Sequence, residues 1–100
     1  MAIVAVSTAP LGEGTSVSEY VASAIEVLEE HPNVEYQLGP MFTTLEGDLD
    51  EVLAVVREMH ESVFEGGALR VNTLIKIDDR RDKDITVQGK LDAVNRRLRG

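Results

Sequence analysis

The stretch LRVNTLIKID at residues 69–78 decides the fold of this chain. Side chains along a β-strand point alternately to opposite faces, so a strand here has two different sides. One side should carry helices and contains Leu69, Val71, Thr73, Ile75 and Ile77. The other offers polar groups to solvent, a ligand or another subunit and contains Arg70, Asn72, Leu74, Lys76 and Asp78. A functional hypothesis starts from this second side, because it gathers the most polar groups.

The composition indicates one water-soluble domain over residues 1–100. Its 43% hydrophobic and 28% charged residues are ordinary for a globular protein. A net charge of −8 argues against nucleic-acid and anionic-membrane partners, because both require a basic surface. No apolar run reaches membrane-spanning length, and the N-terminus lacks the basic region of a signal peptide. We therefore expect a cytoplasmic protein.

Hydrophobic periodicity predicts strands and helices in a recognisable order. The predicted elements are a strand at 2–8, a helix at 16–31, strands at 34–38 and 41–46, a helix at 48–65, the strand at 69–78 and a last helix after Thr86. This order predicts an α+β, ferredoxin-like βαββαβ sandwich with a four-stranded antiparallel sheet, two helices on one face and an extra C-terminal helix. The other face would stay open unless a second copy or the last helix covers it.

Helix-end signals support these boundaries. Ser16 and Glu19 form a capping-box pattern, and Asp48 and Thr86 are suited to cap the second and last helices. Gly66 and Gly67 should end the second helix, because left-handed C-terminal caps usually require glycine. Along the last helix, a narrow apolar stripe comprises Val87, Leu91, Val94 and Leu98.

Catalytic and metal-binding patterns are missing from the sequence. There is no cysteine, which excludes disulfides and zinc–thiolate sites. His31 and His60 are far apart, and neither has a second histidine at helical spacing. None of the serines belongs to a nucleophile motif. We therefore predict no catalytic residues, no metal, no cofactor and no enzymatic activity.

The strand at 41–46 ends in polar residues that suit a ligand. Thr43, Thr44 and Glu46 lie in the same predicted sheet as Arg70 and Asn72. Hydroxyls, an amide and a carboxylate could together hold a heterocycle, and the carboxylate could pair with a cationic ring or an aminopyrimidine. The alternative is that the threonines only favour strand structure and that the glutamate lies at the rim.

At these residues the chain resembles the thiamine-binding protein family (YkoF-like, ferredoxin-like fold). The resemblance covers nearly the whole chain and depends on the joint order of short motifs: Pro10-Leu11-Gly12, Ser16-Val17-Ser18-Glu19-Tyr20-Val21, Gly39-Pro40-Met41, Thr43, Glu46-Gly47, Gly67, Arg70-Val71 and the run from Ile75 to Lys83. It implies dimers that pair into tetramers through exposed sheet faces. It also implies binding of thiamine or its hydroxymethylpyrimidine part near a subunit interface, without an established catalytic activity. The matching polar positions are Thr43, Glu46, Arg70, Asn72 and Lys76.

Two functions follow as expectations. The first is a small-molecule binding protein for thiamine or its hydroxymethylpyrimidine moiety, active as a homo-oligomer without nucleic-acid or membrane partners. The second is a non-catalytic regulatory or assembly module, in which the polar sheet face is only an oligomer interface. A sheet covered on one face leaves residues such as Leu74 exposed. Both of these functions therefore predict that the chain self-associates.

Overall fold

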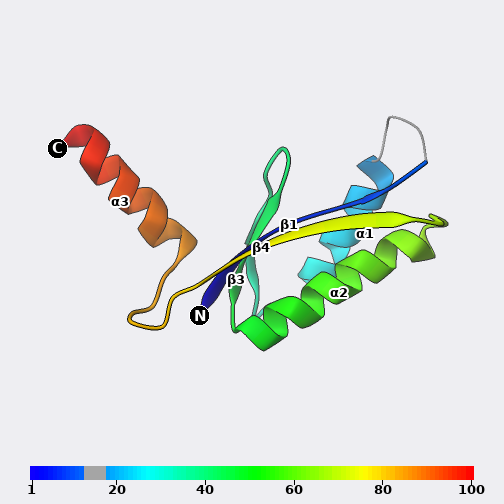
Figure 1. Cartoon of the computed structure of the whole chain (residues 1–100), viewed down its shortest axis with the longest axis horizontal. Coiled ribbons are helices and arrows are strands. Elements are labelled where there is room, and N and C mark those ends of the chain that lie inside the picture. The colour runs from blue at the N-terminus through cyan, green and yellow to red at the C-terminus, as the bar shows by residue number, and fades with distance from the viewer. Residues whose placement is uncertain (13–17) are drawn as a thin grey trace.

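A computed structural model describes residues 1–12 and 18–100 of the chain. The elements follow the predicted order: β1 (Ala2–Pro10), α1 (Ser18–Glu29), β2 (Glu35–Gln37), β3 (Thr43–Gly47), α2 (Leu49–Glu65), β4 (Val71–Asp79) and α3 (Val87–Arg99). The sheet has the order β2-β3-β1-β4, and each neighbouring pair is antiparallel. The α+β, ferredoxin-like prediction is confirmed, with α1 and α2 packed together beside the sheet (Figure 1).

The two sides of β4 are arranged as the alternation predicts. Ile77 lies opposite Val4 of β1, and Ile75 lies opposite Val6. Directly opposed residues share one face of a sheet, and Val4 and Val6 belong to the buried core beneath the helices. Asn72 and Lys76 therefore point to the other face, which α1 and α2 leave open.

The core lies between this sheet and the helices α1 and α2. Its fully buried side chains come from every layer and include Val4, Leu28, Leu45, Val52 and Met59. His31, just after α1, also pairs with Glu58 of α2 at the surface. The two helices are thus held to each other as well as to the sheet.

The helix-end predictions are confirmed in part. The Asp48 carboxylate accepts from the Glu51 amide at 3.4 Å, and the Thr86 hydroxyl accepts from the Gly89 amide at 2.9 Å. Helix α2 ends where the two glycines predict, with Gly66 as its C-cap at a right-handed φ of −74° and Gly67 at a left-handed φ of 107°. One left-handed residue is enough to turn the chain out of α2. The predicted cap at Ser16 lies outside the described residues.

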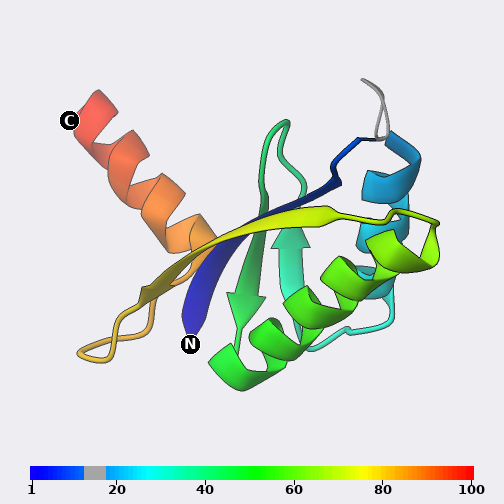
Figure 2. The same cartoon turned by 45° about the vertical axis from the view of Figure 1, so that its right-hand side comes forward.

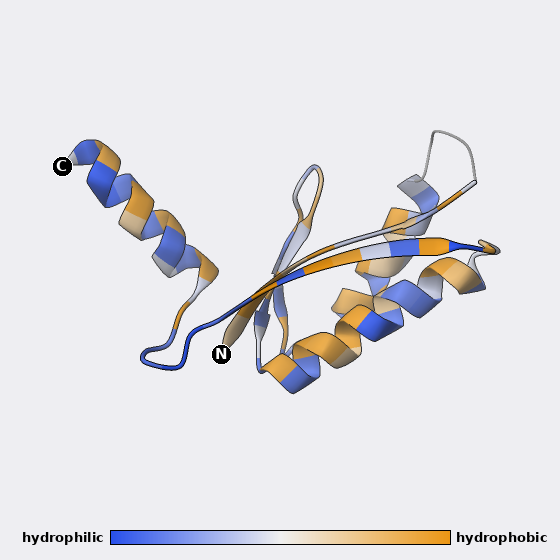
Figure 3. Cartoon of the chain, in the orientation of Figure 1, coloured by the Kyte–Doolittle hydropathy of each residue, from blue (hydrophilic) through white to orange (hydrophobic). Residues whose placement is uncertain are grey.

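Helix α3 departs from the body at the end opposite α1 (Figures 1 and 2). None of its residues is buried, and the second half of its apolar stripe faces solvent, with Val94 at 56% and Leu98 at 79% exposure. Hydrophobic and hydrophilic residues alternate around it without a covering layer (Figure 3). It lines only one corner of the open sheet face, beside β2 and β3.

Within residues 1–12 and 18–100, no helix is long and apolar enough to cross a bilayer.

Candidate ligand-binding site

A small cavity lies on the helix side of the sheet, between α1 and the loop that joins β2 to β3. Its volume is about 90 Å³. Apolar side chains form most of its walls, and Thr8 of β1 and Thr43 of β3 contribute hydroxyls; the apolar walls include Val6, Ile25, Leu38, Met41 and Met59. An apolar space with a few polar groups is typical of a site for a small organic ligand.

The Thr43 hydroxyl is the most informative group in this cavity. Thr43 is only 7% exposed, and its side chain has no hydrogen-bond partner among the described residues. In the same part of the chain, no fully shielded side-chain nitrogen or oxygen lacks a partner. The Thr43 hydroxyl must therefore open into the cavity, where it is available to a ligand.

The second hydroxyl, that of Thr8, belongs to a chain of hydrogen bonds. Thr8 Oγ1 lies 2.8 Å from Thr73 Oγ1, and Thr73 Oγ1 lies 2.6 Å from Nδ1 of His60. The tautomer of His60 decides the direction of this chain. If Nδ1 accepts from Thr73, Thr73 can accept from Thr8, which leaves the lone pairs of Thr8 for a ligand donor. His60 itself packs edge to face against Phe64, with ring centroids 5.4 Å apart.

A second cavity, of about 300 Å³, lies on the open face between β2, β3 and the first turns of α3. Glu35, Gln37, Thr44 and Glu46 give it a polar floor. The Glu46 carboxylate accepts from the backbone N–H of Val87 at 3.4 Å. Glu46 therefore holds the start of α3 against the sheet, which is a structural role at the positive end of the helix dipole.

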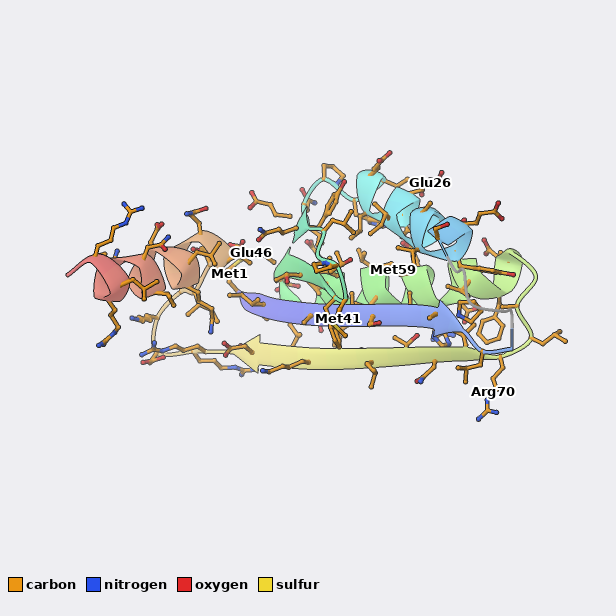
Figure 4. The ribbon with its side chains drawn as sticks, turned by 90° about the horizontal axis from the view of Figure 1, so that it is seen from above. Met1, Glu26, Met41, Glu46, Met59 and Arg70 are labelled. Atoms are coloured by element: carbon orange, nitrogen blue, oxygen red, sulfur yellow. The ribbon has the colours of Figure 1, made fainter. Side chains whose placement is uncertain are left out.

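The five predicted ligand residues are distributed over the two faces of the sheet. Thr43 lines the small cavity on the helix side, whereas Glu46, Asn72 and Lys76 belong to the open face. Arg70 precedes β4, and its side chain points away from the body at the end opposite Glu46 (Figure 4). A single chain thus does not bring the five together, and a ligand role for each of them stays a prediction.

Sequence reasoning missed Thr8, Met59 and the loop from Leu38 to Met41 as parts of one cavity. The sequence does contain an indication for Thr8. Val4, Val6 and Thr8 point to the same face of the first strand, and Thr8 is the polar residue on that otherwise apolar face. No such signal marks Met59, whose position depends on how α2 packs.

Charged groups elsewhere do not add a second chemistry. Among the residues that the structure describes, no group of three or more potential ligands could hold a metal ion. In the exposed loop after β4, a hydrogen bond from Arg80 lowers the pKa of Asp82, and the same contact raises the pKa of Arg80. These residues lie far along the chain from the threonine cavity.

The fold and the cavity together define the class: a ferredoxin-like α+β domain with a small cavity beside the sheet that Thr8 and Thr43 help to line. The chain belongs to the thiamine-binding protein family, whose model matches residues 4–95. The family is described by binding and not by a reaction.

Relatives and solved structures agree with this assignment. The chain is 45% identical over 102 residues to the UPF0045 protein YqgV of Bacillus subtilis, covering 98% of each chain. It resembles the crystal structure of MJ1052 from Methanocaldococcus jannaschii with a TM-score of 0.87 and 42% identity, over 94% of this chain and 95% of that one. A candidate thiamine biosynthesis or salvage protein of Thermotoga maritima, TM0486, matches with a TM-score of 0.77 and 27% identity, over 93% and 97% of the two chains.

Proposed function

We propose that this protein binds thiamine or its hydroxymethylpyrimidine moiety, with the pyrimidine ring in the threonine cavity. The observation that carries the proposal is the hydroxyl of Thr43, a residue that is only 7% exposed and whose side chain has no partner among the described residues. Because no fully shielded side-chain oxygen lacks a partner among those residues, this hydroxyl is accessible from the cavity, and a hydrogen bond from it to a ligand would contribute about 0.5–1.5 kcal/mol. Family membership supplies the ligand class.

The size of the cavity favours one ring and not a whole thiamine molecule. Sites that enclose drug-sized ligands usually measure about 300–1,000 Å³, whereas this cavity measures about 90 Å³. An aminopyrimidine has an exocyclic amino group and ring nitrogens, which match two hydroxyls that can each donate and accept. The thiazolium ring would then project outward, where the net charge of −8 favours a cation.

Isothermal titration of the wild-type protein and three variants tests this proposal. Thr43→Val removes the hydroxyl but keeps the shape, and we expect about tenfold weaker binding of thiamine and hydroxymethylpyrimidine, the effect of one hydrogen bond. Thr43→Ser should retain most of the affinity. Thr44→Val is the matched control, because the neighbouring side chain lies on the open face. Absence of heat at millimolar thiamine, or equal affinities for Thr43→Val and wild type, would falsify the proposal.

The second candidate is an assembly module that uses the open sheet face as an interface between copies. The observation in its favour is Leu74, which is 56% exposed on that face, midway along the edge strand β4. In this case Arg70→Ala and Leu74→Lys should each dissociate the oligomer in light-scattering measurements, whether or not thiamine is present. That the protein forms a homotetramer and that it is located in the cytoplasm are also proposals.

A further inference from the structure

Three hydrogen-bonding side chains connect the surface of α2 to the threonine cavity. Thr8, which lines the cavity, is bonded to Thr73 directly opposite it on β4, and Thr73 is bonded to Nδ1 of His60. His60 is only partly buried, and its Nε2 has no hydrogen-bond partner among the described residues. Since no fully shielded side-chain nitrogen in that part of the chain lacks a partner, Nε2 reaches solvent. The chain of bonds therefore runs from solvent to the proposed pyrimidine site.

The distances indicate which group donates in each of these bonds. The 2.6 Å between Thr73 Oγ1 and His60 Nδ1 is shorter than the range of about 2.7–3.2 Å for N–H donors, so the Thr73 hydroxyl donates to Nδ1. A hydroxyl has one hydrogen, and that of Thr73 is thereby committed to His60. Thr73 must then accept from Thr8 across 2.8 Å, an ordinary distance between two hydroxyls. Thr8 is left with lone pairs only and presents an acceptor to the cavity.

Protonation of the imidazole would reverse this chain of bonds. A protonated imidazole donates from both nitrogens, so Nδ1 would donate to Thr73. The hydrogen of Thr73 would then be donated to Thr8, and the hydrogen of Thr8 would be released toward the cavity. Histidine is the side chain whose charge ordinarily changes between about pH 5 and 8. The same three residues can therefore offer a ligand either an acceptor or a donor.

We propose that His60 is a positioning residue that makes the pyrimidine selectivity of the cavity depend on pH. Neutral His60 turns Thr8 into an acceptor for the exocyclic amino group of an aminopyrimidine. Protonated His60 turns Thr8 into a donor for the carbonyl oxygen of an oxopyrimidine. This inference rests on the proposed function and adds the ligand chemistry and the regulation of the same cavity. Thr43 has no such bias, because a hydroxyl without a protein partner can donate or accept.

The charged groups around His60 do not fix the direction of the chain of bonds. The side chains that β4 turns toward α2 in this region are uncharged; they are Val71, Thr73 and Ile75. On α2 itself, Arg57 precedes His60 by about one turn and Glu61 follows it, and both are exposed. Tyr20 of α1 lies against Gly66, more than a turn further along α2. Because His60 takes part in no ion pair within the described residues, its own proton decides the direction.

Titration calorimetry with two pyrimidines at two pH values tests this inference. The first probe is hydroxymethylpyrimidine, which carries the amino group, and the second is its analogue with a carbonyl oxygen in that place. In wild type, the affinity for the amino compound divided by that for the oxo compound should fall about tenfold between about pH 8 and about pH 5, the effect of one hydrogen bond. Protonation of the ligands themselves would act equally on wild type and on all variants.

Three variants separate the chain of bonds from other effects of pH. His60→Asn keeps a polar partner for Thr73 but does not titrate, and Thr73→Val breaks the chain while leaving Thr8 and Thr43 in place. Both variants should bind the two pyrimidines with a ratio that lacks the tenfold change, and their circular dichroism spectra should match that of wild type. His31→Asn is the matched control, because His31 is the other of the two histidines and pairs with Glu58 at the surface. It should behave as wild type.

The tautomer of His60 gives a readout that needs no ligand. In nitrogen-15 NMR of the free protein at about pH 8, Nδ1 of His60 should be unprotonated and Nε2 protonated. A protonated Nδ1 at that pH, or a wild-type pH dependence that persists in His60→Asn, would overturn the inference. If both pyrimidines bind wild type with a ratio that does not change with pH, this inference fails and the proposed function stands. If neither pyrimidine binds at either pH, the proposed function fails and the inference fails with it.

Discussion

His60 is the residue that controls how the cavity presents its second hydroxyl. It contacts Thr73, which in turn contacts Thr8. In His60→Phe, Thr73 loses its hydrogen bond to His60 and competes with the ligand for the Thr8 hydroxyl. Thiamine should therefore bind about tenfold more weakly. Titration calorimetry measures the effect, and Glu61→Gln, an exposed neighbour on α2, serves as the control. Unchanged affinity in His60→Phe would show that the chain of hydrogen bonds does not reach the ligand.

Asp82 gives a residue-level prediction about pH. The hydrogen bond from Arg80 lowers the pKa of the Asp82 carboxyl in the folded protein. Its stabilising contribution is therefore present above the pKa of the unfolded chain and is lost as the pH falls through the folded value. In Arg80→Ala the pKa of Asp82 should rise toward that of an ordinary aspartate, as a pH titration of its carboxyl carbon by NMR would detect. Because the pair is exposed, thermal stability at neutral pH should hardly change.

The sheet face to which each strand residue points could be predicted from the sequence, but the residues that it contacts in the folded chain could not. Alternation alone placed Ile75 and Ile77 on the helix side and Asn72 and Lys76 on the open side, because that alternation is fixed by the strand backbone. The distance between Glu46 and Arg70 depends instead on strand order and register, which long-range pairing decides. Thr43 and Glu46 lie three residues apart on one strand, so alternation alone places them on opposite faces, whereas the cavity that Thr43 lines depends on how α1 and α2 pack on the sheet.

At the level of elements, two similar caps should have different effects. Asp48 caps α2, which carries much of the core, whereas Thr86 caps α3, which buries nothing. Asp48→Ala should lower the free energy of unfolding by about 1 kcal/mol in urea denaturation. Thr86→Ala should leave that free energy unchanged and instead speed amide hydrogen exchange within α3. Asp50→Ala, in the first turn of α2 but not its cap, is the control; equal losses for both cap variants would contradict this account.

Strand β2 and helix α3 show what hydrophobic periodicity does not predict. The alternation over residues 34–38 predicts a five-residue strand, but β2 pairs with β3 only from Glu35 to Gln37. β3 itself runs from Thr43 to Gly47 and in the same register would reach positions 38 and 34, so the length of the partner strand does not explain why β2 is shorter. The apolar stripe correctly predicted that α3 is a helix. The exposure of α3 depends on the surface against which the helix packs, and no local sequence pattern contains that information.

For the whole molecule, charge and shape separate α3 from the rest. Residues 87–99 carry four cations and one carboxylate, a net charge of +3, which leaves −11 on the other residues of a chain with −8 in total. Lys90 reaches Asp78 at 2.5 Å, and Val87 donates to Glu46. These contacts are exposed or only partly buried, and such pairs contribute at most about 1 kcal/mol. Helix α3 is therefore a weakly attached cationic element on an acidic body.

A chain that ends at Thr86 tests this division. Since no residue of α3 is buried, the truncated protein should keep its fold, with a melting temperature within about 5 °C of wild type by circular dichroism. Thiamine affinity should also be retained, because the threonine cavity lies on the opposite side of the sheet from α3 and is lined by no residue of it. Glu46→Gln in the full chain is the milder companion, since it weakens only the contact to Val87. A loss of folding or of dimers on truncation would mean that the Leu91, Val94 and Leu98 stripe is covered by another copy in solution, so that α3 belongs to the assembly and not to the single chain.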